Sequence, residues 1–98
     1  MFLLLAGGAT ADDEAACVHR ISIVDMRFRP ASLEVQLGDL VEWTNSDLVA
    51  HTATAVDGAF DTGTLESGQS KRVVVARKGT FPYACRYHTS MKGTLTVR

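Results

Sequence analysis

From residue 21 to the C-terminus, apolar and polar residues alternate in short stretches, which is the pattern of β-strands with one buried face. The first stretch runs from Ile21 to Phe28 and continues to Arg29, and Pro30 ends it. A second unit joins the alternating residues 33–37 to residues 41–43 through a tight turn at Gly38-Asp39, so we expect a hairpin there.

Further strand candidates lie at residues 51–56, 71–76, 80–85 and 93–98. Turn signals separate them, among them Asp57-Gly58 and Lys78-Gly79. No stretch has a convincing helical period. Seven to eight short strands, with turns every 8–12 residues or so, predict an all-β sandwich.

The first seventeen residues follow a different pattern. Phe2–Leu5 and the small residues 6–11 resemble the end of a secretory signal peptide with its cleavage site. The apolar run is far shorter than the roughly 20 residues that span a bilayer, so we expect no transmembrane segment. We therefore predict a partial signal peptide or flexible leader at 1–17, one domain at 18–98, and a periplasmic or otherwise extracytoplasmic location. A ragged cytosolic N-terminus is the alternative.

Length and charge limit the classes of function. At 98 residues the chain is one domain, and its formal charge of −1 favours neither nucleic acid nor a membrane surface as partner. All ten Lys/Arg but only eight of the eleven Asp/Glu lie beyond residue 17, so the domain itself carries about +2. No catalytic triad or phosphate-binding loop is visible, and we expect a monomer without enzymatic activity.

The candidate chemistry lies in one short segment near the C-terminus. Cys85, His88 and Met91 follow one another at intervals of three residues, and His51 is available from another strand. Two imidazoles, a thiolate and a weak axial thioether are the ligands of type 1 copper. Two histidines and a cysteine also suit zinc.

Two further residues offer less. Cys17 lies in the leader, where we expect a free thiol. A disulfide to Cys85 is the alternative, and it would remove the proposed ligand. His19 has no ligand neighbours in sequence, and we expect it at a strand edge.

From about residue 20 to residue 98 the chain resembles the cupredoxins of the plastocyanin and amicyanin type. The motifs that carry this resemblance, in family order and spacing, are Phe28-x-Pro30, Leu33-x-Val35, Gly38-Asp39-x-Val41-x-Trp43-x-Asn45-x-Asp47-x-x-x-His51-Thr52, Phe60-Asp61-x-Gly63 and Tyr83-x-Cys85-x-x-His88-x-x-Met91-x-Gly93.

The resemblance implies a Greek-key β-sandwich and an extracytoplasmic electron carrier with one copper ion per chain. It implies four ligands: His51, which faces inward, Cys85 as thiolate, His88, and Met91 as the weak axial ligand. It also implies that His88 presents its ring edge at the surface, where a redox donor and acceptor would dock.

The chain departs from the family pattern beside the ligands. Tyr87 stands where proline is common before the second histidine, so loop rigidity is expected from packing. Thr52 and Arg86 replace the Asn and Ser/Thr side chains that bridge the two ligand segments in the family. Because Arg86 and Lys92 flank His88, we expect a docking face of basic character.

Three other readings remain. A copper-handling protein would use the same residues for Cu(I) delivery or storage without cycling. A copper oxidase or nitrite reductase needs further histidine ligands, and only His19 is spare. A β-sandwich that serves adhesion or protein interaction without a metal is the third, and in that case the spacing of Cys85, His88 and Met91 would be a coincidence.

Overall fold

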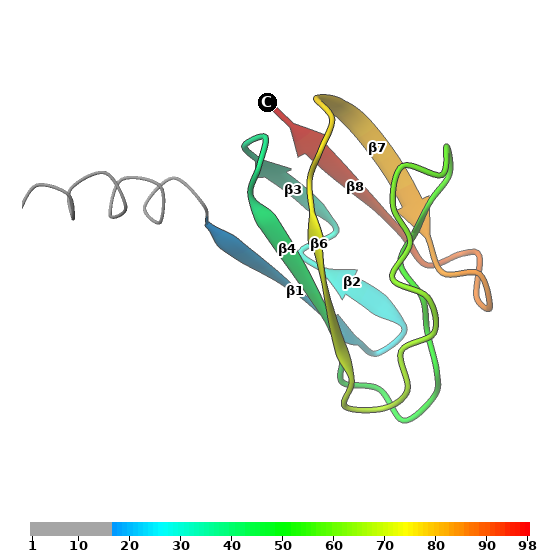
Figure 1. The fold of residues 1–98 in the computed structure, drawn as a ribbon. Coiled ribbons are helices and arrows are strands. Elements are labelled where there is room, and N and C mark those ends of the chain that lie inside the picture. Colours follow the sequence, from blue (N-terminus) through cyan, green and yellow to red (C-terminus); the bar gives the residue numbers. More distant parts are fainter. Residues whose placement is uncertain (1–16) are drawn as a thin grey trace, which may run out of the picture.

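Residues 17–98, described here from a computed structural model, form two packed four-stranded sheets (Figure 1). The predicted leader, apart from Cys17, lies outside these residues. The strands are β1 (Val18–Val24), β2 (Arg27–Arg29), β3 (Ser32–Val35), β4 (Leu40–Asn45), β5 (Thr54–Ala55), β6 (Ser70–Val74), β7 (Gly79–Ala84) and β8 (Lys92–Val97). The all-β sandwich is confirmed. In the same residues no helix has the length and apolar character needed to cross a membrane.

The strand order is β2-β1-β4-β6 in one sheet and β3-β8-β7-β5 in the other. β1 pairs with β4 and β3 pairs with β8 in parallel, and the remaining pairs are antiparallel. The predicted hairpin between β3 and β4 is wrong, because the turn at Gly38-Asp39 carries the chain from one sheet to the other. Alternation identifies a strand but does not name its partner.

The first predicted strand also differs, because it is a hairpin. Asp25 and Met26 turn the chain with positive φ angles of 54° and 60°, so β2 folds back antiparallel on β1. Ile23 pairs with Phe28, and both side chains remain buried. Two-residue hairpin turns with positive φ are usually marked by Asn-Gly or Asp-Gly. The sequence Asp-Met carries no such mark, and Met26 happens to fit the apolar alternation.

An aromatic cluster joins the two sheets. The ring of Tyr83 on β7 packs edge-on against Phe28, Trp43 and Phe60, at centroid distances of 4.7, 5.5 and 5.6 Å. Such edge-to-face pairs add to the free energy gained by burying the rings. Burial raises the pKa of Tyr83 to about 12, so the phenol stays neutral. Since Cys85 follows two residues after Tyr83, this cluster fixes the end of β7 where the site begins.

His19, which we expected at a strand edge, contacts Asp39 at the start of the chain segment that leads into β4. Its Nε2 lies 2.9 Å from Oδ2 of Asp39, whose side chain is 2% exposed. The backbone N–H of Gln36, the His19 ring and the N–H of Cys17 hold the pKa of Asp39 below its usual value. Cys17 and Cys85 are both free thiols, so the alternative disulfide is absent.

Gly93 on β8 provides the space that the Tyr83 ring needs. A Cβ at this position would overlap the ring, with Cε1 only 2.7 Å away. We expect Gly93→Ala to destabilise the metal-free protein by about 1–3 kcal/mol, measured by urea unfolding, because the ring must move out of a packed cluster. Thr94→Ala on the same strand serves as control. Equal stability of the two variants would contradict this account of Tyr83.

Candidate metal centre

Three of the four predicted ligands meet at one end of the sandwich. His51 lies in the connection from β4 to β5, Cys85 directly follows β7, and His88 lies in the loop to β8. One donor atom from each side chain lies within 4.8 Å of the other two. In Figure 1 this loop, drawn in orange, extends from the end of the sandwich opposite the C-terminus. The fold therefore brings together residues that are 34 positions apart in sequence.

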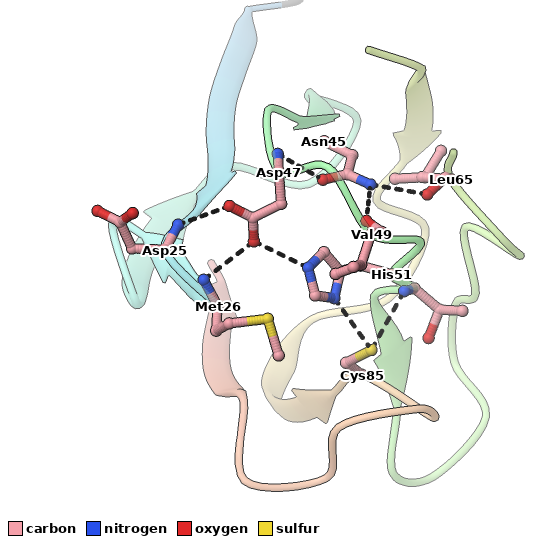
Figure 2. Close-up of polar contacts among 9 residues, drawn as sticks. Asp25, Met26, Asn45, Asp47, Val49, His51, Leu65 and Cys85 are labelled. Atoms are coloured by element: carbon pink, nitrogen blue, oxygen red, sulfur yellow. Dashed lines mark hydrogen bonds and ion pairs between the residues drawn. The ribbon is translucent and has the colours of Figure 1, made fainter. Parts of the chain in front are cut away.

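The backbone and the ring of His51 are both held in place. Its backbone exchanges two hydrogen bonds with Leu65, at 3.1 and 2.7 Å. Its ring is fully buried, and Nε2 lies 2.8 Å from Oδ2 of Asp47 (Figure 2). A carboxylate can only accept, so Nε2 carries a proton, and in the neutral ring Nδ1 is then the nitrogen with the lone pair. That lone pair points toward the Cys85 sulfur, 3.7 Å away.

Asp47 is itself fixed by the β1–β2 turn. Its two oxygens accept the N–H groups of Asp25 at 2.7 Å and Met26 at 2.9 Å, as Figure 2 shows. Burial opposes its ionisation, but the Met26 N–H, the His51 ring and the Asp25 N–H outweigh burial, and the pKa of Asp47 lies below its usual value. Asp47 therefore remains a carboxylate and orients the His51 ring.

Buried Asn45 shapes the loop that carries Asp47. Its Nδ2 donates to the carbonyls of Val49 and Leu65, each at 2.8 Å, and its Oδ1 accepts the Asp47 N–H at 2.9 Å. An inward-facing polar residue is tolerated because all these groups are paired. Asn45 thereby sets the path of the chain between β4 and His51.

Cys85 is fully buried and its sulfur has a second polar neighbour. The N–H of Thr52 lies 3.4 Å from Sγ, in the geometry of an N–H donor to a sulfur acceptor. The N–H of Cys85 itself donates to the Met91 carbonyl at 3.2 Å and closes the loop of residues 85–91. The thiolate is the form of cysteine that binds metals, and the Thr52 N–H offers its sulfur a donor.

His88 differs from His51 in its exposure. The residue is half-buried, yet Nδ1 is buried and has no hydrogen-bond partner among the described residues. A buried unpaired nitrogen is costly, and a metal bond would satisfy it. Met91 is 3% exposed and its N–H donates to the His88 carbonyl at 2.9 Å, so its side chain is buried and its backbone is tied to the same loop.

These donors fit a copper ion of the type 1 class. A metal ion bound at about 2.0 Å from nitrogen and 2.3 Å from sulfur, the bond lengths of zinc sites, would place the two donor atoms about 3.7 Å apart if the bonds met at about 120°. The observed separation of Nδ1 in His51 and Sγ in Cys85 is 3.7 Å. Two imidazole nitrogens and a cysteine sulfur, with a methionine thioether nearby in sequence, form the donor set that copper uses for electron transfer.

The two ligand segments are connected although the family's usual bridge is replaced. The N–H of Arg86 donates to the hydroxyl of Thr52 at 3.0 Å. Tyr87, in the position where proline is common, forms a short hydrogen bond through its hydroxyl to Thr64. The ring of Tyr87 is half exposed, so hydrogen bonding rather than packing restrains this part of the loop.

Sequence reasoning missed the roles of Asp47 and Asn45. One signal was present, because Asn45 continues the inward alternation of Val41 and Trp43 and a polar residue there must find partners. Asp47 lies four positions before His51, but that spacing alone does not identify a hydrogen-bonded pair in a loop. Its other two partners are 21 and 22 positions away in the β1–β2 turn, which the sequence did not reveal.

A β-sandwich with a His-Cys-His donor cluster at one end is the architecture of a small copper protein. The family description "Cupredoxin-like domain" matches residues 1–97, and the chain belongs to this family.

Individual relatives agree with the family. The chain is 30% identical to amicyanin-alpha from Methylorubrum extorquens, over 96% of this chain and 84% of the relative. It is 27% identical to amicyanin from Paracoccus denitrificans, over 79% of this chain and 63% of the relative.

Solved structures share the fold. A Cu(I) structure of a methionine-to-alanine variant of amicyanin superposes with a TM-score of 0.77 at 23% identity, covering 83% of this chain and 82% of that one. A copper-containing nitrite reductase from Thermus scotoductus superposes with a TM-score of 0.76 at 28% identity, covering 82% of this chain and 22% of that one.

If Asp47 orients the metal-facing histidine, its removal weakens metal binding. We expect Asp47→Ala to lower the affinity for Cu(I) by about 10–100-fold, as for other partners of metal-ligating histidines. Competition with a coloured Cu(I) chelator measures this. Asp57→Ala removes an exposed carboxylate whose ion-pair partner is Arg77, and should leave the affinity unchanged. An Asp47→Ala affinity equal to that of the Asp57→Ala control is the result that refutes this role.

Proposed function

We propose that this protein is a type 1 copper electron carrier that binds one copper ion through His51, Cys85, His88 and Met91. The observation that carries the proposal is the 3.7 Å approach of His51 Nδ1 to the Cys85 sulfur, with each residue restrained by its own partners. Copper bound there would supply one-electron chemistry, alternating between Cu(II) and Cu(I). The protein acts as a carrier and not as an enzyme.

Each residue has a separate role in this proposal. The Asp47 carboxylate fixes His51 and offers a permanent negative charge beside the site. The Thr52 N–H withdraws electron density from the sulfur and so favours the reduced state. Restraints on both segments keep the donors in place whatever their charge, and electron transfer is fast only where the geometry hardly changes.

His88 is proposed as the port for electrons. Its Nδ1 is buried while the residue as a whole is half-buried, and we expect the opposite edge of the ring to reach the surface. We place the docking of the redox donor and acceptor over this ring.

The expected basic character of the docking face needs one correction. Arg86 is paired with Asp61, which offsets its charge. Lys92 is exposed and has no acidic partner within 17–98, so it carries the basic character of this face.

An extracytoplasmic and specifically periplasmic location is part of the proposal, supported by the resemblance to the family and by the signal-like pattern of residues 2–11. A monomer remains our expectation.

Copper handling is the second candidate, because the same soft donors bind Cu(I) tightly. The two functions differ in whether the protein must also bind Cu(II). A carrier holds both oxidation states in one geometry, whereas a delivery protein needs only the reduced ion.

A copper titration separates these candidates. We expect the reduced metal-free protein to take up one Cu(II) with an intense thiolate-to-copper absorption band, which ascorbate removes and reoxidation restores. Cys85→Ser should bind without the band, because the sulfur supplies it. A colourless protein that binds one Cu(I) tightly would support copper handling, and failure to bind stoichiometrically would overturn both candidates.

Lys92 gives the docking proposal a direct test. We expect Lys92→Glu to slow oxidation of the copper-loaded protein by hexacyanoferrate(III), a small anionic oxidant, by about 2–10-fold at low ionic strength. Stopped-flow rates at low and high salt measure this, and salt should remove the difference. Lys78→Glu makes the same charge change at the other end of β7, beside Gly79. Equal slowing by both variants would show that net charge alone is responsible.

A further inference from the structure

Four residues around the ligand segments form a closed ring of hydrogen bonds, in which Arg86 takes part through both its backbone N–H and its guanidinium. The N–H of Arg86, next to Cys85, donates to the Thr52 hydroxyl, next to His51, at 3.0 Å. The Thr52 and Thr54 hydroxyls lie 2.9 Å apart, and the Thr54 hydroxyl donates to Oδ1 of Asp61 at 3.0 Å. The other oxygen of Asp61 pairs with the guanidinium of Arg86, which returns the ring to its starting residue.

The directions of these bonds follow from the number of protons. A carboxylate only accepts, so the single hydroxyl proton of Thr54 is used on Asp61. Thr54 must therefore accept from Thr52, and Thr52 uses its own proton there and accepts from the Arg86 N–H. Thr52 and Thr54 each donate once and accept once, whereas Arg86 donates at both of its ends and Asp61 accepts at both. The three bonds from the Arg86 N–H through the two hydroxyls to Asp61 therefore run in one direction, an arrangement in which neighbouring bonds polarise and strengthen one another.

The ring differs in kind from an ordinary surface ion pair. The side chains of Arg86 and Asp61 are 60% and 33% exposed, and such a pair alone contributes only about 0–1 kcal/mol to stability. Thr52, however, is 1% exposed, and its N–H is the donor that faces the Cys85 sulfur. An exposed charge pair is thus connected through two hydroxyls to a buried residue that contacts a ligand.

We propose that Asp61 and Arg86 are positioning residues that hold the His51 and Cys85 segments in register before any metal binds. The family's usual bridge between the two ligand segments consists of other residue types. In this chain Arg86 connects the segments, because its guanidinium reaches Asp61 in the β5–β6 connection. The Gly63 N–H, which also donates to Asp61 at 2.8 Å, fixes that end of the ring. The consequence of this ring for copper rests on the proposed function, whereas its presence in the metal-free protein does not.

The first test uses metal-free protein and the amide exchange rate of the Arg86 N–H, measured by NMR. Thr52→Val removes the acceptor at nearly constant shape, and we expect exchange to rise by about 3–10-fold, the equivalent of one hydrogen bond. Thr52→Ser keeps the hydroxyl and should retain the protection. The amide of Val41, near the start of β4, reports any general loss of stability.

The second variant distinguishes a ring from an isolated hydrogen bond. Asp61→Ala does not touch the Arg86 N–H, yet it should raise the exchange rate of that amide and leave the Val41 amide unchanged. Asp57→Ala breaks the matched Asp57–Arg77 pair elsewhere and should change neither. If Asp61→Ala leaves the Arg86 amide at the wild-type rate, or if Asp57→Ala has the same effect, the proposal is wrong.

The copper-loaded protein gives an independent measurement. We expect Thr52→Val and Asp61→Ala to shift the thiolate-to-copper band and the reduction potential, with Thr52→Ser and Asp57→Ala close to wild type. Unchanged spectra and potentials in Thr52→Val and Asp61→Ala would contradict a positioning role. If the wild-type protein shows no such band, the proposed function fails, and the exchange measurement still decides whether the ring exists.

Discussion

One close approach governs this structure: the Cys85 sulfur and the Nδ1 atom of His51 lie 3.7 Å apart, and both residues are fully buried. Burying an imidazole beside a sulfur is tolerable only if their other polar atoms are paired. Asp47 satisfies Nε2 of the ring, and the Thr52 N–H faces the sulfur. The remaining polar contact is between Nδ1 and the sulfur themselves, two donor atoms at a separation that a metal ion could bridge.

The sandwich is the means by which that approach is maintained. β4 of one sheet leads toward His51, and β7 of the other leads into Cys85. The Tyr83 ring locks the sheets together by packing against Trp43 from the opposite sheet, and the bare Cα of Gly93 makes room for it. A rigid core of this kind resists the small displacements that a change in charge at the site would otherwise cause. The packing is therefore the feature that would keep structural changes small when the charge at the site changes.

How far the sequence led can be judged from particular residues. The ligand candidates and the strand count followed from local spacing and alternation, because those patterns depend on side chains within a few positions of each other. The hairpin at Asp25-Met26 did not, since its positive φ angles are stabilised by Asp47, 21 and 22 positions away. The assignment of β3 and β4 to different sheets also depends on long-range pairing. The partners of Arg86 were hidden for the same reason, and its expected free charge proved to be paired with Asp61.

The central claim is that the protein chain, and not the metal, sets the positions of the ligands. Crystal structures of the metal-free, Cu(I) and Cu(II) forms at high resolution test it most directly. The account predicts that the His51 Nδ1 to Cys85 Sγ separation and the Asp47–His51 hydrogen bond agree among all three within about 0.5 Å. A metal-free form in which His51 has turned away from Asp47, or in which the loop of residues 85–91 has opened, would contradict it.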